Sequence, residues 1–238
     1  MQPGAIIGEA WRLYKEHWKH FLPIALVIFL ILAVVSLLLA LVLGALGAVL
    51  GALIGIIGIF WLQGALVEAV ADVRDGRADL SIGDTFRRVQ PRLPSIIGAG
   101  LLAGLGIALG FVLLIIPGLF LLTIWSMIVP SIVLEGKGAM ESFGRSRELV
   151  RGNGWSVFGV IVLSILVVIA VAIVVSIATF WLPDEPQAFL QNLIQNTLAY
   201  PFFALTLTLT YFALAGRATA AEPAMTMPPP PPAPPPPA

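Results

Sequence analysis

The sequence has no cysteine and only two histidines. The absence of cysteine excludes disulfide bonds and thiolate chemistry. Charge is also scarce: Asp, Glu, Lys and Arg make up 11% of the 238 residues, whereas soluble domains contain roughly 25%. The thirteen basic and thirteen acidic side chains cancel, so the chain lacks the basic excess of nucleic-acid-binding proteins. We therefore expect no nucleic-acid partner.

The groupings that carry catalysis are missing as well. The apolar segments contain no paired carboxylates, no nucleophile next to a base and no cluster of metal ligands. The two histidines, His17 and His20, lie three residues apart without a carboxylate cluster beside them. We expect no bound metal, no cofactor and no enzymatic activity.

What the sequence has in abundance is apolar residues in long uncharged runs. Hydrophobic residues make up 59% of the chain, and the mean hydropathy is +1.00. A helix needs roughly 20 residues to cross a bilayer. Residues 21–67 and 93–134 are each long enough for two such helices, and residues 152–183 and 186–216 for one each. We predict an all-α membrane protein with six transmembrane helices in three hairpins. The predicted spans are residues 22–43, 46–69, 95–116, 118–135, 156–182 and 188–214.

The basic residues predict an orientation. Turns within the three hairpins are expected at residues 44–47, 117–118 and 184–185, and all thirteen Lys and Arg residues fall on the opposite side of the spans. Loops rich in Lys and Arg stay in the cytoplasm. The pattern therefore predicts a multi-pass protein of the bacterial cytoplasmic (plasma) membrane with both termini inside. We assign residues 1–217 to the transmembrane domain and residues 218–238 to a disordered, proline-rich cytoplasmic tail.

Three short segments on the basic side carry apolar residues at helical spacing, and each precedes a predicted hairpin. They are residues 7–18, 82–93 and 139–150. In each segment an aromatic residue follows an acidic one by two positions: Trp11, Phe86 and Phe143. Short amphipathic helices of this kind lie in the membrane interface. We predict one cytoplasmic interfacial helix before each hairpin. The similarity of the three segments indicates either a threefold repeat or the amphipathic character common to loop helices.

One part of the chain resembles a known family. Residues 115–118, "IIPG", and 123–155, "TIWSMIVPSIVLEGKGAMESFGRSRELVRGNGW", are similar to the membrane domain of glycerophosphoryl diester phosphodiesterases and to related uncharacterised bacterial six-span proteins. The resemblance covers roughly residues 70–165. In such proteins the chemistry belongs to a separate soluble barrel, which has no counterpart in this sequence. The resemblance therefore implies a lipid-related membrane module without phosphodiesterase activity.

Seven polar residues in or near the predicted spans are candidate functional or structural positions. They are Gln63, Glu68, Glu135, Arg145, Arg151, Gln195 and Asn196. Each glutamate either pairs with a loop arginine or couples protons or substrate. The three amides either line a water-filled path or form hydrogen bonds between helices.

The features together favour a non-enzymatic integral membrane module that associates with lipids or acts as a scaffold. The alternative is a transporter or channel subunit that uses the polar residues of the sixth span. We expect the lipid bilayer as partner, with anionic headgroups bound by the cytoplasmic arginines. The tail is a candidate ligand for a protein groove. Glycines spaced four apart (Gly47, Gly51, Gly55; Gly100, Gly104) predict close helix packing within the chain or between copies.

Overall fold

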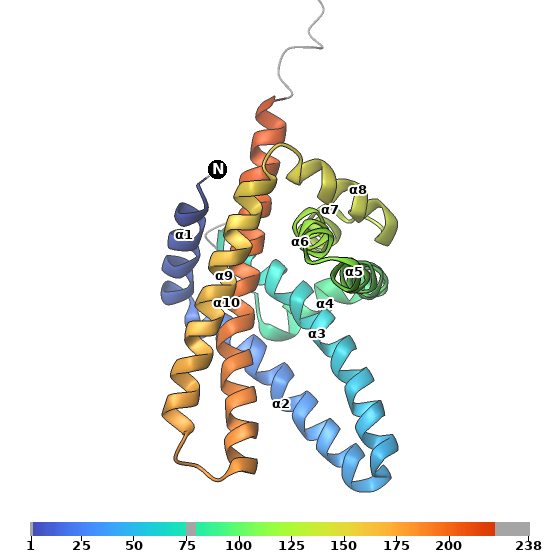
Figure 1. Cartoon of the computed structure of the whole chain (residues 1–238), viewed down its shortest axis with the longest axis vertical. Helices are drawn as coiled ribbons and strands as arrows, with labels where there is room; N and C mark the ends of the chain where they lie inside the picture. Colours follow the sequence, from blue (N-terminus) through green and yellow to red (C-terminus); the bar gives the residue numbers. More distant parts are fainter. Residues whose placement is uncertain (1, 75–79, 222–238) are drawn as a thin grey trace, which may run out of the picture.

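The computed structural model describes residues 2–74 and 80–221 (Figure 1). The described residues are almost all helical, and none of them lies in a strand. The helices are α1 (Pro3–Glu16), α2 (Trp18–Leu43), α3 (Ala45–Arg74), α4 (Ile82–Val89), the 3-10 turn η1 (Gln90–Arg92), α5 (Leu93–Leu113), α6 (Ile115–Ile124), α7 (Ile128–Glu135), α8 (Ala139–Val150), α9 (Gly154–Thr179) and α10 (Asp184–Ala221). Six helical segments among them are long and apolar enough to cross a membrane. The prediction of an all-α chain with six such segments is confirmed.

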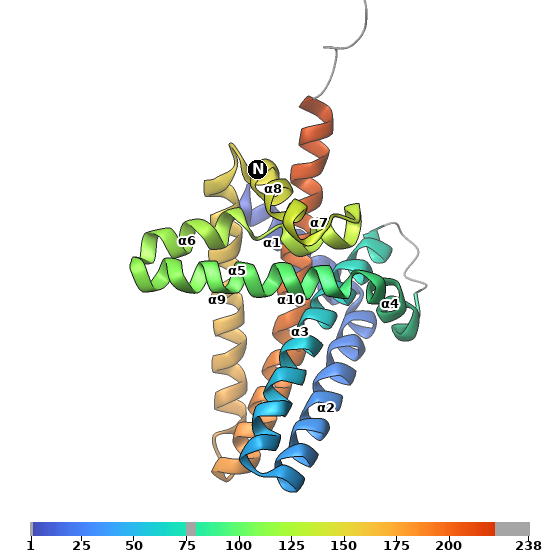
Figure 2. The ribbon, with the colours of Figure 1, turned by 90° about the vertical axis from the view of Figure 1, so that its right-hand side faces the viewer.

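Four long helices extend toward one end of the molecule, with α2 and α3 inclined to α9 and α10 (Figure 1). The helix α2 packs along α3, and α9 packs along α10, with both turns at the same end of the molecule (Figures 1 and 2). The helices α5 and α6 also pack against each other, but they lie across the other four, and their turn projects to the side (Figure 2). The arrangement as three equivalent hairpins is therefore not confirmed. We call the end of the molecule opposite the α2–α3 and α9–α10 turns the basic end, because it holds α1 and α8, which carry Lys and Arg residues (Figure 2). The helix α4 also carries arginines and lies between the two ends (Figure 2).

The largest core cluster lies towards the basic end, where α1, α2, α3 and α10 meet. Phe21, Leu62, Leu66 and Leu205 are fully buried in it. Large apolar side chains remain exposed along the outer faces of the helices, most strongly near the α5–α6 turn, where Val112 is 82% exposed. An exposed apolar surface of this extent is typical of a protein that is surrounded by lipid.

The turns show where glycine is required and where proline is tolerated. Gly44 ends α2 with a φ of 57°, which favours glycine. The second turn lies at Leu114, so its prediction at Pro117 and Gly118 is wrong by three residues. Pro117 is the third residue of α6, where a helix leaves its N–H groups without internal partners and proline therefore costs little. Gly118 belongs to the helix and packs on Gly110, whose Cβ, if present, would lie 2.9 Å from the Gly118 Cα.

The three amphipathic helices each pack against a neighbouring helix: α1 against α10, α4 against α3, and α8 against α7. In α4 the apolar residues at helical spacing face the core, with Val89 fully buried, but α1 and α8 depart from this pattern. In α1 it is Ile6 and Ala10 that are buried, whereas Trp11 is 47% exposed. In α8, Ser142 and Ser146 are buried and Met140 is exposed. The buried faces therefore combine small side chains with apolar ones such as Ile6, Leu149 and Val150.

Residues 222–238, which hold most of the predicted proline-rich tail, lie outside the described residues. The helix α10 continues to Ala221, four residues past the predicted end of the membrane domain at residue 217.

Candidate functional site

An ion pair joins the end of α7 to α8. The Nε of Arg145 donates to both carboxylate oxygens of Glu135, at 2.8 and 2.9 Å, and its Nη1 donates to Glu148 at 3.0 Å. Tyr211 of α10 donates its hydroxyl to the same Glu135 carboxylate at 2.6 Å. Burial alone would lower the pKa of Arg145, but the hydrogen bonds to Glu135 and Glu148 more than offset it, and the pKa is raised. The network therefore fixes three helices around a charged pair.

A second, weaker pair lies at the end of α3. Arg88 of α4 lies 3.4 Å from Glu68, with the arginine side chain 58% exposed and the carboxylate 15% exposed. Beside it the indole Nε1 of Trp61 donates to the backbone carbonyl of Phe86 at 3.2 Å. Both candidate glutamates thus pair with a loop arginine, which is the structural one of the two roles expected from the sequence.

The aromatic residues that mark the three amphipathic helices make equivalent contacts. Each packs edge-to-face against a ring from a long helical segment: Phe86 against Trp61, Phe143 against Trp125, and Trp11 against Phe202. The ring centroids lie 5.5, 5.1 and 6.0 Å apart. Phe86 and Phe143 each contact a ring in the apolar segment that precedes their own helix. Trp11, in the first helix of the chain, contacts Phe202 in the last one, α10. The three contacts therefore connect the start, middle and end of the chain in a closed cycle. The threefold repeat stays a prediction, because the α5–α6 pair lies across the other long helices and is not equivalent to them (Figure 2).

A break in the fourth apolar segment changes the spacing between the aromatic ring and the glutamate, compared with the second apolar segment. Glu68 follows Trp61 by seven residues, whereas Glu135 follows Trp125 by ten. The three extra residues match the interruption between α6, which ends at Ile124, and α7, which begins at Ile128. Glu135 therefore still reaches Arg145, although it is three residues farther from Trp125 than Glu68 is from Trp61.

Ser146 of α8 fills this interruption. Its Oγ donates to the carbonyl of Ile124 at 2.7 Å and accepts from the N–H of Met127 at 3.1 Å. The side chain is fully buried. One hydroxyl therefore satisfies a donor and an acceptor that the break would leave unpaired.

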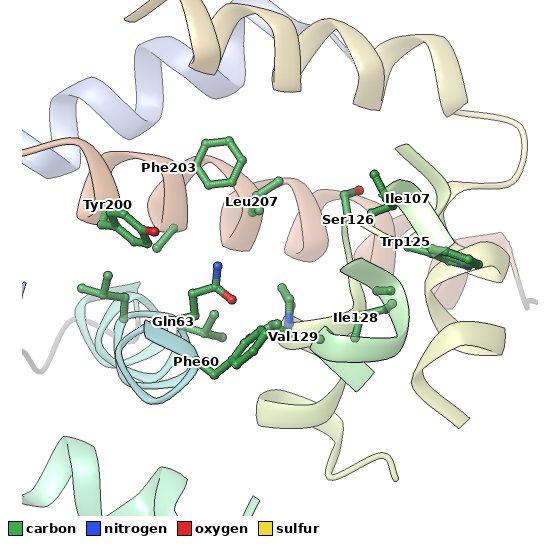
Figure 3. Close-up of a pocket in the computed structure, with 16 residues that line it drawn as sticks. Phe60, Gln63, Ile107, Trp125, Ser126, Ile128, Val129, Tyr200, Phe203 and Leu207 are labelled. Carbon is green, nitrogen blue, oxygen red and sulfur yellow. The ribbon is translucent and has the colours of Figure 1, made fainter. Parts of the chain in front are cut away.

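A cavity of about 240 Å³ lies between α3, α5, α10 and the α6–α7 break (Figure 3). Its wall is mostly aromatic and aliphatic, with Phe60, Trp125 and Phe203 among the lining residues. The Gln63 side chain points into the cavity (Figure 3), and no hydrogen bond joins it to another described residue. No carboxylate or basic side chain among the described residues lines it. Such a cavity suits a small, largely apolar group that can accept or donate one hydrogen bond.

The other candidate residues lie elsewhere. Gln195 donates to the carbonyl of Ala172 in α9 at 3.3 Å, and Asn196 donates to Asn192 at 2.9 Å. Neither lines the cavity of Gln63. Arg151 is exposed and makes no ion pair with a described residue.

Three contact residues are missing from the sequence-based candidates: Ser146, Tyr211 and Tyr14. Tyr14 donates to the carbonyl of Leu198 at 3.1 Å, and burial raises its pKa to about 12. Tyr211 lies in an apolar stretch, where a hydroxyl needs a buried partner, and that need was the available signal. Tyr14 and Ser146 lie between charged residues, where the sequence gives no such signal.

The described part of the chain is thus an all-helical protein with six segments long and apolar enough to cross a membrane, which is consistent with a multi-pass membrane protein. Residues 21–221 match the family described as "Domain of unknown function (DUF7847)", and the chain belongs to this family. No curated protein and no solved structure matches it. The resemblance to the membrane domain of glycerophosphoryl diester phosphodiesterases stays a prediction.

Proposed function

We propose that this chain is a non-enzymatic module of the bacterial cytoplasmic membrane that associates with lipids and organises them or a protein partner. In this proposal the basic end faces the cytoplasm, both termini lie inside, and α1, α4 and α8 lie in the membrane interface. The lipid-related module implied by the resembling phosphodiesterase family is of the same kind.

The observation that carries the proposal is the use of the two glutamates near the basic end. Glu135 is held by Arg145 and Tyr211, and Glu68 pairs with Arg88. A carboxylate that works as an acid, a base or an ion relay needs a path to its substrate. Both carboxylates instead connect helices, as expected of a scaffold.

The test is lipid retention by the full-length protein. We expect native mass spectrometry of protein extracted in a mild detergent to show phospholipid bound at a fixed ratio after extensive washing. A washed protein that stays folded and carries no lipid would contradict the proposal. In parallel, proteoliposomes that contain the protein should release trapped glycerol and small ions no faster than protein-free vesicles.

The cavity at Gln63 favours a second candidate, a transporter or channel subunit, because an amide without a hydrogen-bond partner faces an apolar space. Under this alternative, Gln63→Leu would abolish a solute flux that the wild-type protein supports. Gln195→Leu is the matched control, since that amide is bonded to Ala172 and lies outside the cavity.

A further inference from the structure

A groove at the basic end has a charged half and an apolar half. The helix α6 contacts both α8 and α9, and the start of α9 lies next to α8 (Figures 1 and 2). Two hollows open between these helices, of about 690 and 580 Å³. Both are lined by Phe120, Ile124, Gly152 and Gly154, so they form one continuous groove.

The charged half carries two arginines that have no ion-pair partner among the described residues. Arg147 and Arg151 line it, both are exposed, and neither forms an ion pair within the part of the chain that the structure describes. One acid, Glu148, lines the same half and lies 3.0 Å from Arg145, whose charge it shares with Glu135. Even if Glu148 offsets one of the two arginines, the other remains uncompensated. The groove therefore presents an excess of positive charge.

The apolar half presents large exposed side chains. Trp155 is 88% exposed and Phe120 is 60% exposed, and Leu119 and Phe158 complete this wall. An apolar surface beside unpaired arginines matches a ligand that has an anionic head and an acyl chain. The first turn of α9 adds to this match, because it has no side-chain cap and its N–H groups favour an anion.

We propose that this groove binds one anionic phospholipid, with the phosphate at Arg147 and Arg151 and an acyl chain along Phe120 and Trp155. The proposal rests on the proposed lipid association and goes further, because it names the ligand class and the site. A free phosphate would leave the apolar half uncovered, and a zwitterionic lipid would leave the positive charge uncompensated.

The test measures lipid binding to the washed full-length protein by native mass spectrometry, with phosphatidylglycerol and phosphatidylcholine of identical chains and with glycerol 3-phosphate. We expect wild-type protein to bind phosphatidylglycerol at least tenfold more tightly than phosphatidylcholine. The double variant R147Q/R151Q should bind it about thirtyfold more weakly, because each base near the surface contributes about fivefold. R12Q/K15Q removes two exposed charges from α1 at the same end and should stay within about twofold of wild type.

A second variant blocks the groove without removing charge. Gly144 lines the charged half, and an added Cβ would meet no atom within 4 Å, so a larger side chain can begin there without a clash. We expect G144W to place its ring in the groove and to keep the thermal unfolding midpoint of the wild-type protein. It should weaken phosphatidylglycerol binding at least tenfold. For the unaltered protein, a photoreactive phosphatidylglycerol analogue should crosslink to the peptide that contains Trp155.

The opposite results would overturn the site. These are equal binding of the two lipids, equal losses in the α1 and α8 double variants, competition by glycerol 3-phosphate as strong as by the lipid, or crosslinks only outside α6, α8 and α9. Lipid retained without headgroup preference would overturn the groove and leave the proposed function standing. Absence of all retained lipid would overturn both.

Discussion

Arg145 and Glu135 form an ion pair in which the arginine Nε donates a bifurcated hydrogen bond to both carboxylate oxygens, at 2.8 and 2.9 Å. The pair connects α8 to the end of α7, and Tyr211 brings α10 to the same carboxylate. The side chains of the pair are only 23% and 20% exposed. The charge that the sequence places in a loop between two apolar segments therefore holds that loop on the helices.

Removing the cation of this pair should destabilise the protein. Arg145→Met leaves the Glu135 carboxylate largely buried without its counter-ion, and we expect a loss of about 2–3 kcal/mol in the free energy of unfolding. Thermal unfolding of the purified protein in detergent should show a midpoint lower by about 5 °C or more. Arg87→Met is the control, because Arg87 pairs with Asp84 with its side chain 78% exposed. Equal shifts for both variants would contradict the structural role of the buried pair.

Ser146 should matter more than its neighbour one turn away. Ser146→Ala leaves the carbonyl of Ile124 and the N–H of Met127 unpaired in a buried position, which we expect to cost about 2–3 kcal/mol. Ser142→Ala is the matched control, since Ser142 is also buried but donates only to Ala139 of its own helix. Its loss should stay below about 1 kcal/mol. Thermal unfolding distinguishes the two, and an equal effect would show that the α6–α7 break does not depend on Ser146.

Glycines of one motif should respond in opposite ways to the same substitution. A Cβ on Gly47 would lie 1.8 Å from the carbonyl oxygen of Leu39, so Gly47→Ala forces the start of α3 away from α2 and should cost about 2–3 kcal/mol. A Cβ on Gly55 would meet nothing within 4 Å, and Gly55→Ala should stabilise the helix by about 0.5–1 kcal/mol. Unfolding midpoints that fall in both variants would contradict the observed packing of α2 on α3.

Local signals in the sequence predict the helices well and their packing poorly. The uncharged runs give all six apolar segments to within a few residues at most ends. The glycine motif predicts close packing but does not say which glycine is needed: Gly47 and Gly51 approach α2, whereas Gly55 and Gly104 face open space. That difference depends on where two helices cross, and the sequence of one helix does not determine the position of its neighbour.

The site was predictable where one charge needs another. Glu68 and Glu135 lie at the ends of apolar runs, and loop arginines are their nearest available partners. The role of Ser146 was not predictable. Pro130 marks a break in the helix just before it, but nothing local indicates which side chain fills the break at residues 125–127. Gln63 is a candidate from the sequence, but only the cavity lined by α3, α5 and α10 distinguishes it from Gln195.

The position of the α5–α6 turn provides the sharpest test of the architecture. The turns at the ends of α2 and α9 lie at the same end of the molecule, whereas the α5–α6 pair lies across those helices (Figures 1 and 2). Single cysteines at Leu46, Leu114 and Trp181 probe the three turns, and each replaced side chain is more than half exposed. The natural chain has no cysteine, so each label reports one position. We expect a membrane-impermeant maleimide added to intact cells to label positions 46 and 181 and to leave position 114 unlabelled.

Met140→Cys is the control for the other side, because Met140 is 72% exposed on α8 at the basic end. It should react only after the cells are opened. Labelling of position 114 from outside, together with positions 46 and 181, would mean that α5 and α6 cross the membrane as a third hairpin. Because α6 forms one wall of the groove at Arg147 and Arg151, that result would also separate the apolar half of the groove from its charged half.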